Sequence, residues 1–279
     1  MSVIVVSDSS SRLSAEQRAQ WGILEVPLHV LIDGTDLRDG CDDIPFDVHD
    51  RPKVTTAGAT PADLSDVYRQ ALADSNGDGV VAVHISAALS GTYSAAVMAA
   101  REFGPSVRVV NSRSAAMGVG LIAVEAARTA RAEVDLDAVE AAARKAVNHT
   151  HVFLVVHRLD NLRRSGRLRT AASWLGTALS LKPLLMLDVD GRLVLDQRIR
   201  TVNKAHAAMV ERVVEVVGES SAEVVVHHVD NHDGADELGA TLTQRLPQIS
   251  ALTVTDMGPL LSVHVGSGAV GVAVRVDAP

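Results

Sequence analysis

Short hydroxyl-bearing segments follow several predicted strands of this chain. One of them contains Ser90, Gly91 and Thr92, and it lies where a buried strand at 80–85 gives way to a helix. Two hydroxyls and the free N–H groups of a first helical turn can converge on one anion, and a glycine lets a ligand approach the backbone closely. Taken alone, the same residues equally fit an ordinary helix N-cap.

Three further segments of this kind support the anion-binding interpretation. They are Ser7-Asp8-Ser9, Thr55-Thr56 and Asn111-Ser112, and we predict that each follows a strand. Ligands of parallel sheets bind outside the carboxyl ends of the strands. These segments can therefore be explained either by a shared pocket for a carboxylate or phosphate or by separate helix caps.

Other chemistries have less support. The sequence contains no Gly-x-Ser-x-Gly elbow for a serine nucleophile and no Gly-x-x-x-x-Gly-Lys-Ser/Thr loop for a nucleotide. Residues 266–271 imitate a dinucleotide fingerprint but precede a terminal strand, where that fingerprint should open a helix. The histidines and aspartates of 227–233 match no spacing for a known metal mechanism, and we predict no metal site.

His264 and an arginine-rich segment stand apart from these loops. His264 lies between apolar neighbours, which fits either a core side chain or a role in acid–base chemistry or ligand binding. Five arginines and one acid lie between Arg158 and Arg169. This segment is either solvated surface or a docking patch for an acidic partner or a phosphorylated group.

The pattern of elements predicts two domains. Strands and helices alternate in residues 1–152, which predicts an α/β domain with a mainly parallel sheet flanked by helices. Hairpins mix with helices in 153–279, which predicts an α+β domain. The predicted strands lie at 3–6, 26–32, 80–85, 107–110, 152–156, 184–187, 193–195, 223–229, 251–255 and 269–276. The predicted helices lie at 15–20, 62–73, 93–102, 136–148, 202–217 and 234–245, and 33–50 is expected to be loop.

Length and composition limit the class of protein. The 279 residues exceed the length of one average domain of about 150 residues. The net charge of −8 and an aromatic content of 3% argue against a nucleic-acid-binding protein. The single cysteine, Cys41, cannot form an internal disulfide, and neither a leader nor a long apolar stretch is visible. We therefore expect a cytoplasmic protein without stable membrane insertion.

The order of the motifs resembles that of the DegV family over nearly the whole chain. The motifs are Val-Ser-Asp-Ser-Ser at 6–10, Leu-Ser-Gly-Thr-Tyr-Ser-Ala at 89–95, Asn-Ser at 111–112, and the segments 162–168, 181–185, 190–191 and 257–269. The resemblance implies a fatty-acid-binding protein of two domains, with the acyl chain in a tunnel between them, no cofactor, and the carboxylate held by hydroxyls. Members can serve as the lipid-carrying subunit of a bacterial fatty acid kinase, in which a separate ATP-binding protein phosphorylates that carboxylate.

The resemblance also suggests roles for individual residues. Thr56 and Ser90 would contact the carboxylate, His264 would lie near the head group, and Arg167 would work with the kinase partner. Additional ligand-binding candidates are Thr60, Gly91, Thr92 and Ser112, and Arg163 and Arg164 join Arg167 as docking candidates.

Departures from the family pattern bear on the head-group loop. Residues 56–60 read Thr-Ala-Gly-Ala-Thr where the family has Thr-Ser-x-Pro-Ser. Ala57 removes a hydroxyl and Ala59 removes a proline that would stiffen the loop, and Thr60 is the residue that could compensate. Asn111, Ser165 and Ser267 replace the family's Asp, Gly and Pro.

We expect a lipid carrier that binds a long-chain fatty acid and presents its carboxylate to the kinase subunit without catalysing a reaction itself. One alternative is an acyl hydrolase or transferase that uses Ser90 with His264. The other is a regulatory docking module that uses Arg163, Arg164 and Arg167.

Overall fold

The computed structural model describes residues 3–132, 134–168 and 181–277, and the chain divides into two compact units. Unit 1 comprises Met1–Asp43 and Thr56–Asn148, and unit 2 comprises Ile44–Thr55 and His149–Pro279. Sequence reasoning placed a single boundary after residue 152. The observed division is discontinuous, because the segment Ile44–Thr55 leaves unit 1 and is grouped with unit 2.

A four-stranded parallel sheet forms the centre of unit 1. Its order is β2-β1-β6-β7, with β2 at Ile23–Val26, β1 at Ile4–Asp8, β6 at Val80–His84 and β7 at Val107–Asn111. The central strands are rich in Val and are buried on both faces, as parallel strands covered by helices must be. The predicted parallel sheet is confirmed. Its strands end at one common edge.

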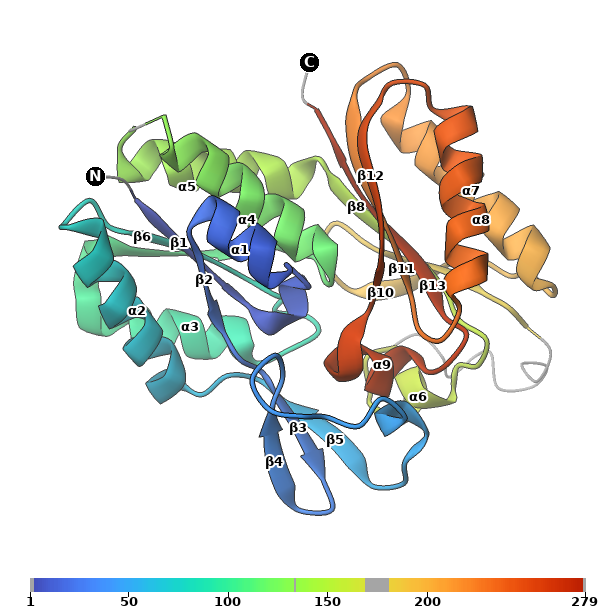
Figure 1. The fold of residues 1–279 in the computed structure, drawn as a ribbon, viewed down its shortest axis with the longest axis horizontal. Helices are drawn as coiled ribbons and strands as arrows, with labels where there is room; N and C mark the ends of the chain where they lie inside the picture. The colour runs from blue at the N-terminus through green and yellow to red at the C-terminus, as the bar shows by residue number, and fades with distance from the viewer. Residues whose placement is uncertain (1–2, 133, 169–180, 278–279) are drawn as a thin grey trace. The chain divides into compact units, whose positions relative to one another are not determined.

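Helices cover both faces of this sheet. Figure 1 shows α4 (Met117–Ala130) and α5 (Leu136–Asn148) on one face, and α2 (Pro61–Ser75) and α3 (Thr92–Ala100) on the other. The short helix α1 (Ala15–Trp21) begins with a capping box in which Ser14 pairs with Gln17. The 3-10 turns are η1 (Ser9–Ser11) and η3 (Arg101–Ser106).

The predicted strand over 26–32 is partly wrong, because residues 27 and 28 separate two strands. The chain leaves the parallel sheet at Val26 and enters a separate strand, β3 (His29–Ile32). Pro27 has no N–H for a sheet hydrogen bond, and the N–H of Leu28 donates to Ser9 Oγ at 3.1 Å instead. The predicted loop over 33–50 is also partly wrong, because it contains β4 (Thr35–Arg38) and η2 (Val48–Asp50). With β5 (Val54–Ala57), these strands form a sheet in the order β4-β3-β5.

A six-stranded mixed sheet organises unit 2, in the order β10-β9-β8-β13-β11-β12. The pair β11/β12 is parallel, and the other neighbours run antiparallel. The strands are β8 (Thr150–Val155), β9 (Leu184–Leu187), β10 (Leu193–Gln197), β11 (Ala222–His228), β12 (Ile249–Asp256) and β13 (Val270–Val276). The helices are α6 (Asp160–Arg164), α7 (Val202–Val217), α8 (His232–Arg245) and α9 (Gly258–Val265). The predicted hairpin and α+β character are confirmed.

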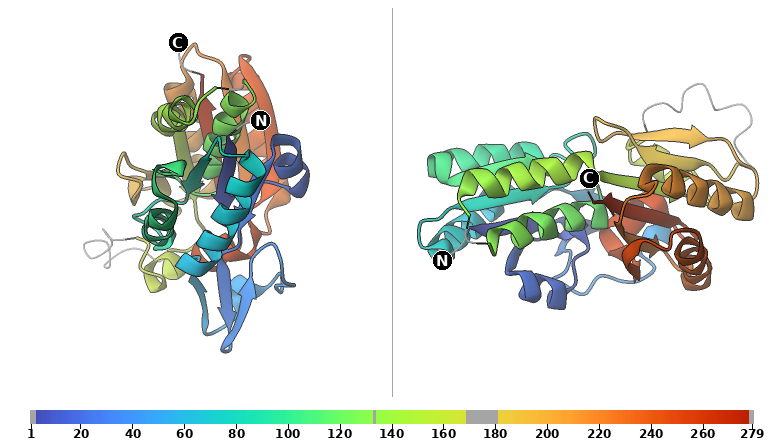
Figure 2. Two further views of the ribbon diagram at one scale, coloured as in Figure 1. Left: turned by 90° about the vertical axis from the view of Figure 1, so that its left-hand side faces the viewer. Right: turned by 90° about the horizontal axis from the view of Figure 1, so that it is seen from above.

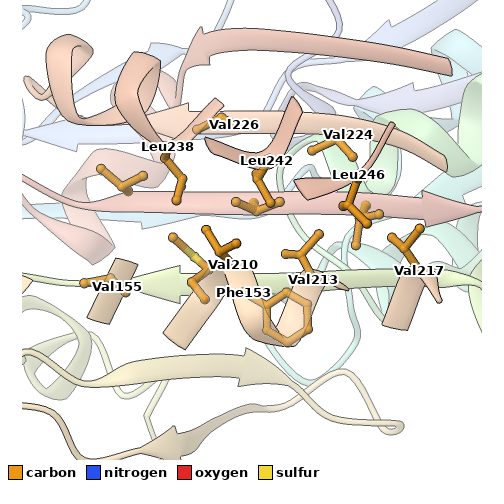
Figure 3. Packing of buried hydrophobic residues seen from close by; sticks show 14 of the residues in the cluster. Phe153, Val155, Val210, Val213, Val217, Val224, Val226, Leu238, Leu242 and Leu246 are labelled. Carbon is orange, nitrogen blue, oxygen red and sulfur yellow. The ribbon is translucent and has the colours of Figure 1, made fainter. Parts of the chain in front are cut away.

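The main core of unit 2 is a cluster of apolar side chains between two helices and the sheet. Helices α7 and α8 pack against each other and on the sheet, and Figure 2 shows them from two further sides. Figure 3 shows the side chains that α7 and α8 direct toward Phe153 of β8 and toward the neighbouring strands. On α8 the buried leucines recur every fourth residue, at 238, 242 and 246, which places them along one face of the helix. None of the helices in the described ranges is long and apolar enough to cross a membrane.

The segment Ile44–Thr55 contacts the rest of unit 2 through polar groups as well as through packing. His49 is buried, and its Nε2 lies 3.0 Å from Asp230 Oδ2. The amide of Asn161 donates to the backbone oxygen of His49 at 3.4 Å. Because these contacts join residues far apart in sequence, local patterns in 44–55 could not predict them.

Candidate functional site

The turn from β6 to α3 brings two hydroxyls together in unit 1. The N–H of Ser90 donates to the backbone oxygen of Ser86 at 3.1 Å, which closes the turn. Ser90 Oγ and Thr92 Oγ1 lie 2.9 Å apart, and the N–H of Thr92 donates to Ser90 Oγ at 3.2 Å. Thr92 is buried, Ser90 is half-buried and Gly91 is exposed. The predicted Ser-Gly-Thr segment therefore presents a hydroxyl pair at the start of α3.

The backbone after β5 approaches this hydroxyl pair very closely. A Cβ atom on Gly58 would lie 2.6 Å from Thr92 Oγ1 and 3.2 Å from Ser90 Oγ. Such space exists only for glycine, so Gly58 lets the segment that carries Thr56 lie against Ser90 and Thr92. Thr56 itself lies within β5 and does not follow a strand of the parallel sheet, which corrects the predicted placement.

Thr60 caps a helix, whereas the sequence suggested it as an additional ligand-binding residue. It is the N-cap of α2, where its hydroxyl donates to Asp63 Oδ2 at 2.6 Å and accepts from the N–H of Asp63 at 3.2 Å. Pro61 occupies the first turn, where its missing N–H costs no intrahelical hydrogen bond. The hydroxyl that could have replaced the one missing at Ala57 is thus used to begin a helix.

Ser112 joins the turns after β6 and β7. Its N–H donates to the backbone oxygen of His84 at 3.1 Å, and its hydroxyl accepts from the N–H of Ser114 at 3.1 Å. The N–H of Ser86 in turn donates to the backbone oxygen of Ser114 at 2.9 Å. Ser112 is buried, so its evident role is to shape the turn that starts at Ser86.

A buried chain of polar side chains, which sequence reasoning missed, lies at the same strand ends. Asp8 Oδ2 lies 3.0 Å from His84 Nδ1, and His84 Nε2 lies 2.8 Å from the hydroxyl of Tyr68. All three side chains are fully buried. The available signal was His84 itself, which ends an otherwise apolar run of a buried strand and therefore needs polar partners.

Two further carboxyl groups of unit 1 are shielded from water: Glu25 is half-buried and Asp39 is buried. Burial raises the pKa of Glu25 to about 7, even though the guanidinium of Arg18, 2.9 Å away, acts in the opposite direction. Burial also raises the pKa of Asp39. A share of Glu25 is therefore protonated at neutral pH, which makes the stability of the protein sensitive to pH in that range.

His264 and the arginines belong to unit 2, whereas Thr56, Ser90, Thr92 and Ser112 belong to unit 1. His264 lies in the last turn of α9, a helix that the sequence reasoning did not predict. Burial, together with the positive charge of Arg167, lowers the pKa of His264 to about 4. His264 is therefore neutral at pH 7, and its ring can both donate and accept a hydrogen bond.

The arginine segment does not form a uniformly solvated patch. Arg164 is exposed, and its Nη2 donates to Asn161 Oδ1 at 3.0 Å. Arg163 and Arg167 are half-buried, and Arg167 Nη1 donates to a backbone oxygen of its own loop at 2.5 Å. Arg169 lies outside the described residues. Burial and short-range contacts thus fix part of the segment, while Arg164 faces solvent.

Comparison with known proteins agrees with the motifs and the fold. Residues 2–277 match the model of the family described as "Uncharacterised protein, DegV family". The chain belongs to the DegV family. A DegV domain-containing protein of Mycobacterium tuberculosis is 58% identical over 278 residues, covering 100% of this chain and 99% of the relative. Its counterpart in Streptomyces coelicolor is 37% identical over 276 residues, covering 98% of each chain.

Solved DegV structures share the fold from end to end. A fatty-acid-binding DegV family protein from Thermus thermophilus superposes with a TM-score of 0.93 at 29% identity, covering 99% of this chain and 100% of the other. The Corynebacterium glutamicum DegV family protein superposes with a TM-score of 0.88 at 31% identity, covering 100% of this chain and 99% of the other. The architecture described above, with its parallel four-stranded sheet and its mixed six-stranded sheet, is thus the DegV fold.

Proposed function

We propose that this DegV protein binds a long-chain fatty acid and receives its carboxylate at the hydroxyl pair of Ser90 and Thr92. The observation that carries the proposal is the contact of Gly58 with both hydroxyls, because it brings the Thr56 segment to the same point at the edge of the parallel sheet. The named function of the Thermus thermophilus relative supports the choice of ligand. Ser90 Oγ shares a hydrogen bond with Thr92 Oγ1 and accepts another from the N–H of Thr92. This arrangement suits anion binding better than nucleophilic attack by Ser90.

The expected free-energy contributions give the two ends of the ligand different roles in binding. Burying an acyl chain of about 14 methylenes at about 0.8 kcal/mol each contributes a gross term of about 11 kcal/mol, before ordering costs. A hydrogen bond to the charged carboxylate contributes about 1.5–3 kcal/mol. The tail therefore supplies most of the affinity, and the hydroxyls select an acid over other lipids of the same length.

The same proposal extends to a partner. In it, the bound carboxylate is presented in the cytoplasm to a separate ATP-binding kinase subunit, and Arg163, Arg164 and Arg167 contribute to docking. The exposure of Arg164 supports this role more directly than the half-buried positions of Arg163 and Arg167. The chain needs no cofactor of its own in this scheme, because the kinase subunit supplies the ATP.

Mass spectrometry of the protein purified under native conditions tests the ligand. We expect organic extracts to contain long-chain fatty acid in near-stoichiometric amount, with the intact mass of the denatured chain unchanged. Finding no acyl species, together with no binding of added hexadecanoic acid, would overturn the proposal. An acyl adduct on Ser90 would instead support the hydrolase or transferase alternative.

A kinase assay tests the partner. With a fatty acid kinase subunit and ATP, acyl phosphate should form only when this protein is present, and Arg164→Ala should slow the reaction without changing fatty acid affinity. Arg158→Ala is the matched control, since Arg158 is also exposed but is paired with Asp160 at 2.9 Å. Equal turnover of wild type and Arg164→Ala would remove Arg164 from the docking surface.

A further inference from the structure

One carboxylate connects the ends of the two central strands of unit 1. Asp8 follows the apolar run of β1 and is completely buried. Its Oδ1 accepts from the N–H of Ser10 at 3.2 Å and from the Ser10 hydroxyl. Its Oδ2 accepts from the N–H of Ile85 at 3.0 Å and faces His84 Nδ1 at 3.0 Å. Asp8 therefore ties η1, after β1, to the first residue after β6.

The hydrogen-bond pattern indicates which partner donates in each bond. Three other donors already point at the Asp8 carboxyl group, so we assign Nδ1–H of His84 as the fourth. In a neutral ring Nε2 is then an acceptor, and the Tyr68 hydroxyl donates to it over 2.8 Å. Burial and the negative charge of Asp8 raise the pKa of Tyr68, which keeps this hydroxyl protonated. The direction of donation is thus Tyr68 to His84 to Asp8.

This chain of bonds leads directly to the turn that carries Ser90. The N–H of Ile85 is held by Asp8, and the next residue, Ser86, provides the backbone oxygen to which the N–H groups of Leu89 and Ser90 donate at 3.0 and 3.1 Å. The backbone oxygen of His84 accepts from Ser112, which links the turn after β7. The position of Ser90 relative to the sheet therefore depends on where His84 and Ile85 are fixed.

We propose that Asp8, His84 and Tyr68 are positioning residues that hold the Ser86–Thr92 turn in the geometry that recognises a carboxylate. The inference rests on the proposed function and deepens it. A buried ionised group is costly, and an apolar group in its place would often be as stable, so its presence is best explained by the geometry that it imposes. None of the three residues is proposed to contact the ligand. They act through the turn.

The test compares an acid with an alcohol of equal chain length. Affinities for hexadecanoic acid and hexadecan-1-ol are measured for wild type, Asp8→Asn and Tyr68→Phe, together with the urea midpoint of each protein. Tyr68→Phe removes one hydroxyl and no packing volume, so it carries the test if Asp8→Asn does not fold. Val80→Ala is the control, because Val80 is buried at the opposite end of β6, far along the strand from the turn.

The ratio of acid affinity to alcohol affinity is the decisive readout. We expect Asp8→Asn to reduce this ratio about tenfold and Tyr68→Phe about threefold, since the carboxylate loses well-placed donors while the tail is unaffected. Val80→Ala should lower the urea midpoint and leave the ratio unchanged. A ratio unchanged in Tyr68→Phe would overturn the inference and leave the proposed function standing. A wild type that binds neither lipid, or binds both equally, would overturn the proposed function and the inference with it.

Discussion

The sheets of the two units differ in what lies buried against them. In unit 2 the core cluster around β8, β11 and β13 is built from valine, leucine, alanine, methionine and phenylalanine side chains (Figure 3), although His227 of β11 and Arg275 of β13 are buried as well. In unit 1 the central strands β1 and β6 end in the buried polar side chains of Asp8 and His84. Apolar packing stabilises without fixing a direction, whereas a buried hydrogen-bonded group is directional and costly to disturb. The comparison indicates that stability and ligand recognition depend on different residues.

The largest effect is expected from a substitution in the apolar core cluster of unit 2. Phe153→Ala should lower the free energy of unfolding of unit 2 by about 3–5 kcal/mol, because Phe153 is fully buried in the core cluster. Urea unfolding followed by circular dichroism measures the loss. The ratio of acid to alcohol affinity of the remaining folded protein should stay at the wild-type value. A changed ratio would show that the two roles are not separate.

A smaller effect on stability, of opposite sign, is expected when the carboxyl group of Glu25 in unit 1 is replaced. The pKa of Glu25, about 7 in the folded protein, lies above its ordinary value of 4.5. The folded state therefore binds more protons between these values, and this group's contribution to stability is present at low pH and is lost as pH rises to about 7. Glu25→Gln should be more stable than wild type by about 2–3 kcal/mol at pH 8.

The control for this prediction is the same pair of proteins at low pH. At pH 4 the wild-type carboxyl is protonated in the folded state, so the two proteins should unfold at nearly equal urea concentrations. The difference between them isolates Glu25 from every other titrating group. Equal stability at pH 8, or a less stable variant, would show that Arg18 at 2.9 Å outweighs the burial of this carboxylate.

The smallest predicted effect concerns close packing at the hydroxyl pair. Gly58→Ala should weaken hexadecanoic acid binding about tenfold, because its Cβ would lie 2.6 Å from Thr92 Oγ1 and must push the two segments apart. In Thr92→Ala that oxygen is absent. The double variant should therefore bind about as well as Thr92→Ala alone, which titration calorimetry can measure. Fully additive losses would mean that Gly58 acts elsewhere.

Regular elements of this chain could be predicted from the sequence. The helix predicted at 202–217 coincides with α7, because its buried residues repeat with helical spacing. The helix predicted at 136–148 coincides with α5, and Asp135 caps it, since its Oδ1 accepts from the N–H of Ala138 at 2.8 Å. Family motif order also led to the Ser90 turn and to the family itself, which comparison confirms.

Contacts between distant segments could not be predicted. Gly58 occupies an unspecified position of its motif, and its importance follows only from the approach of Thr92. The partners Asp8 and His84 lie 76 residues apart, and no local pattern relates them. The strand prediction over 26–32 was only partly correct, because the apolar pattern continues across Pro27 while the backbone changes sheets.

Carbon-13 NMR of hexadecanoic acid labelled at its carboxyl carbon tests most directly where the carboxylate is recognised. In the wild type we expect one bound resonance that does not titrate between pH 5 and 8, because hydrogen bonds hold the carboxylate ionised. Ser90→Ala should shift that resonance, and Phe153→Leu should leave it in place. A bound resonance that titrates like the free acid, at the same position in wild type and Ser90→Ala, would contradict carboxylate recognition at the edge of the parallel sheet.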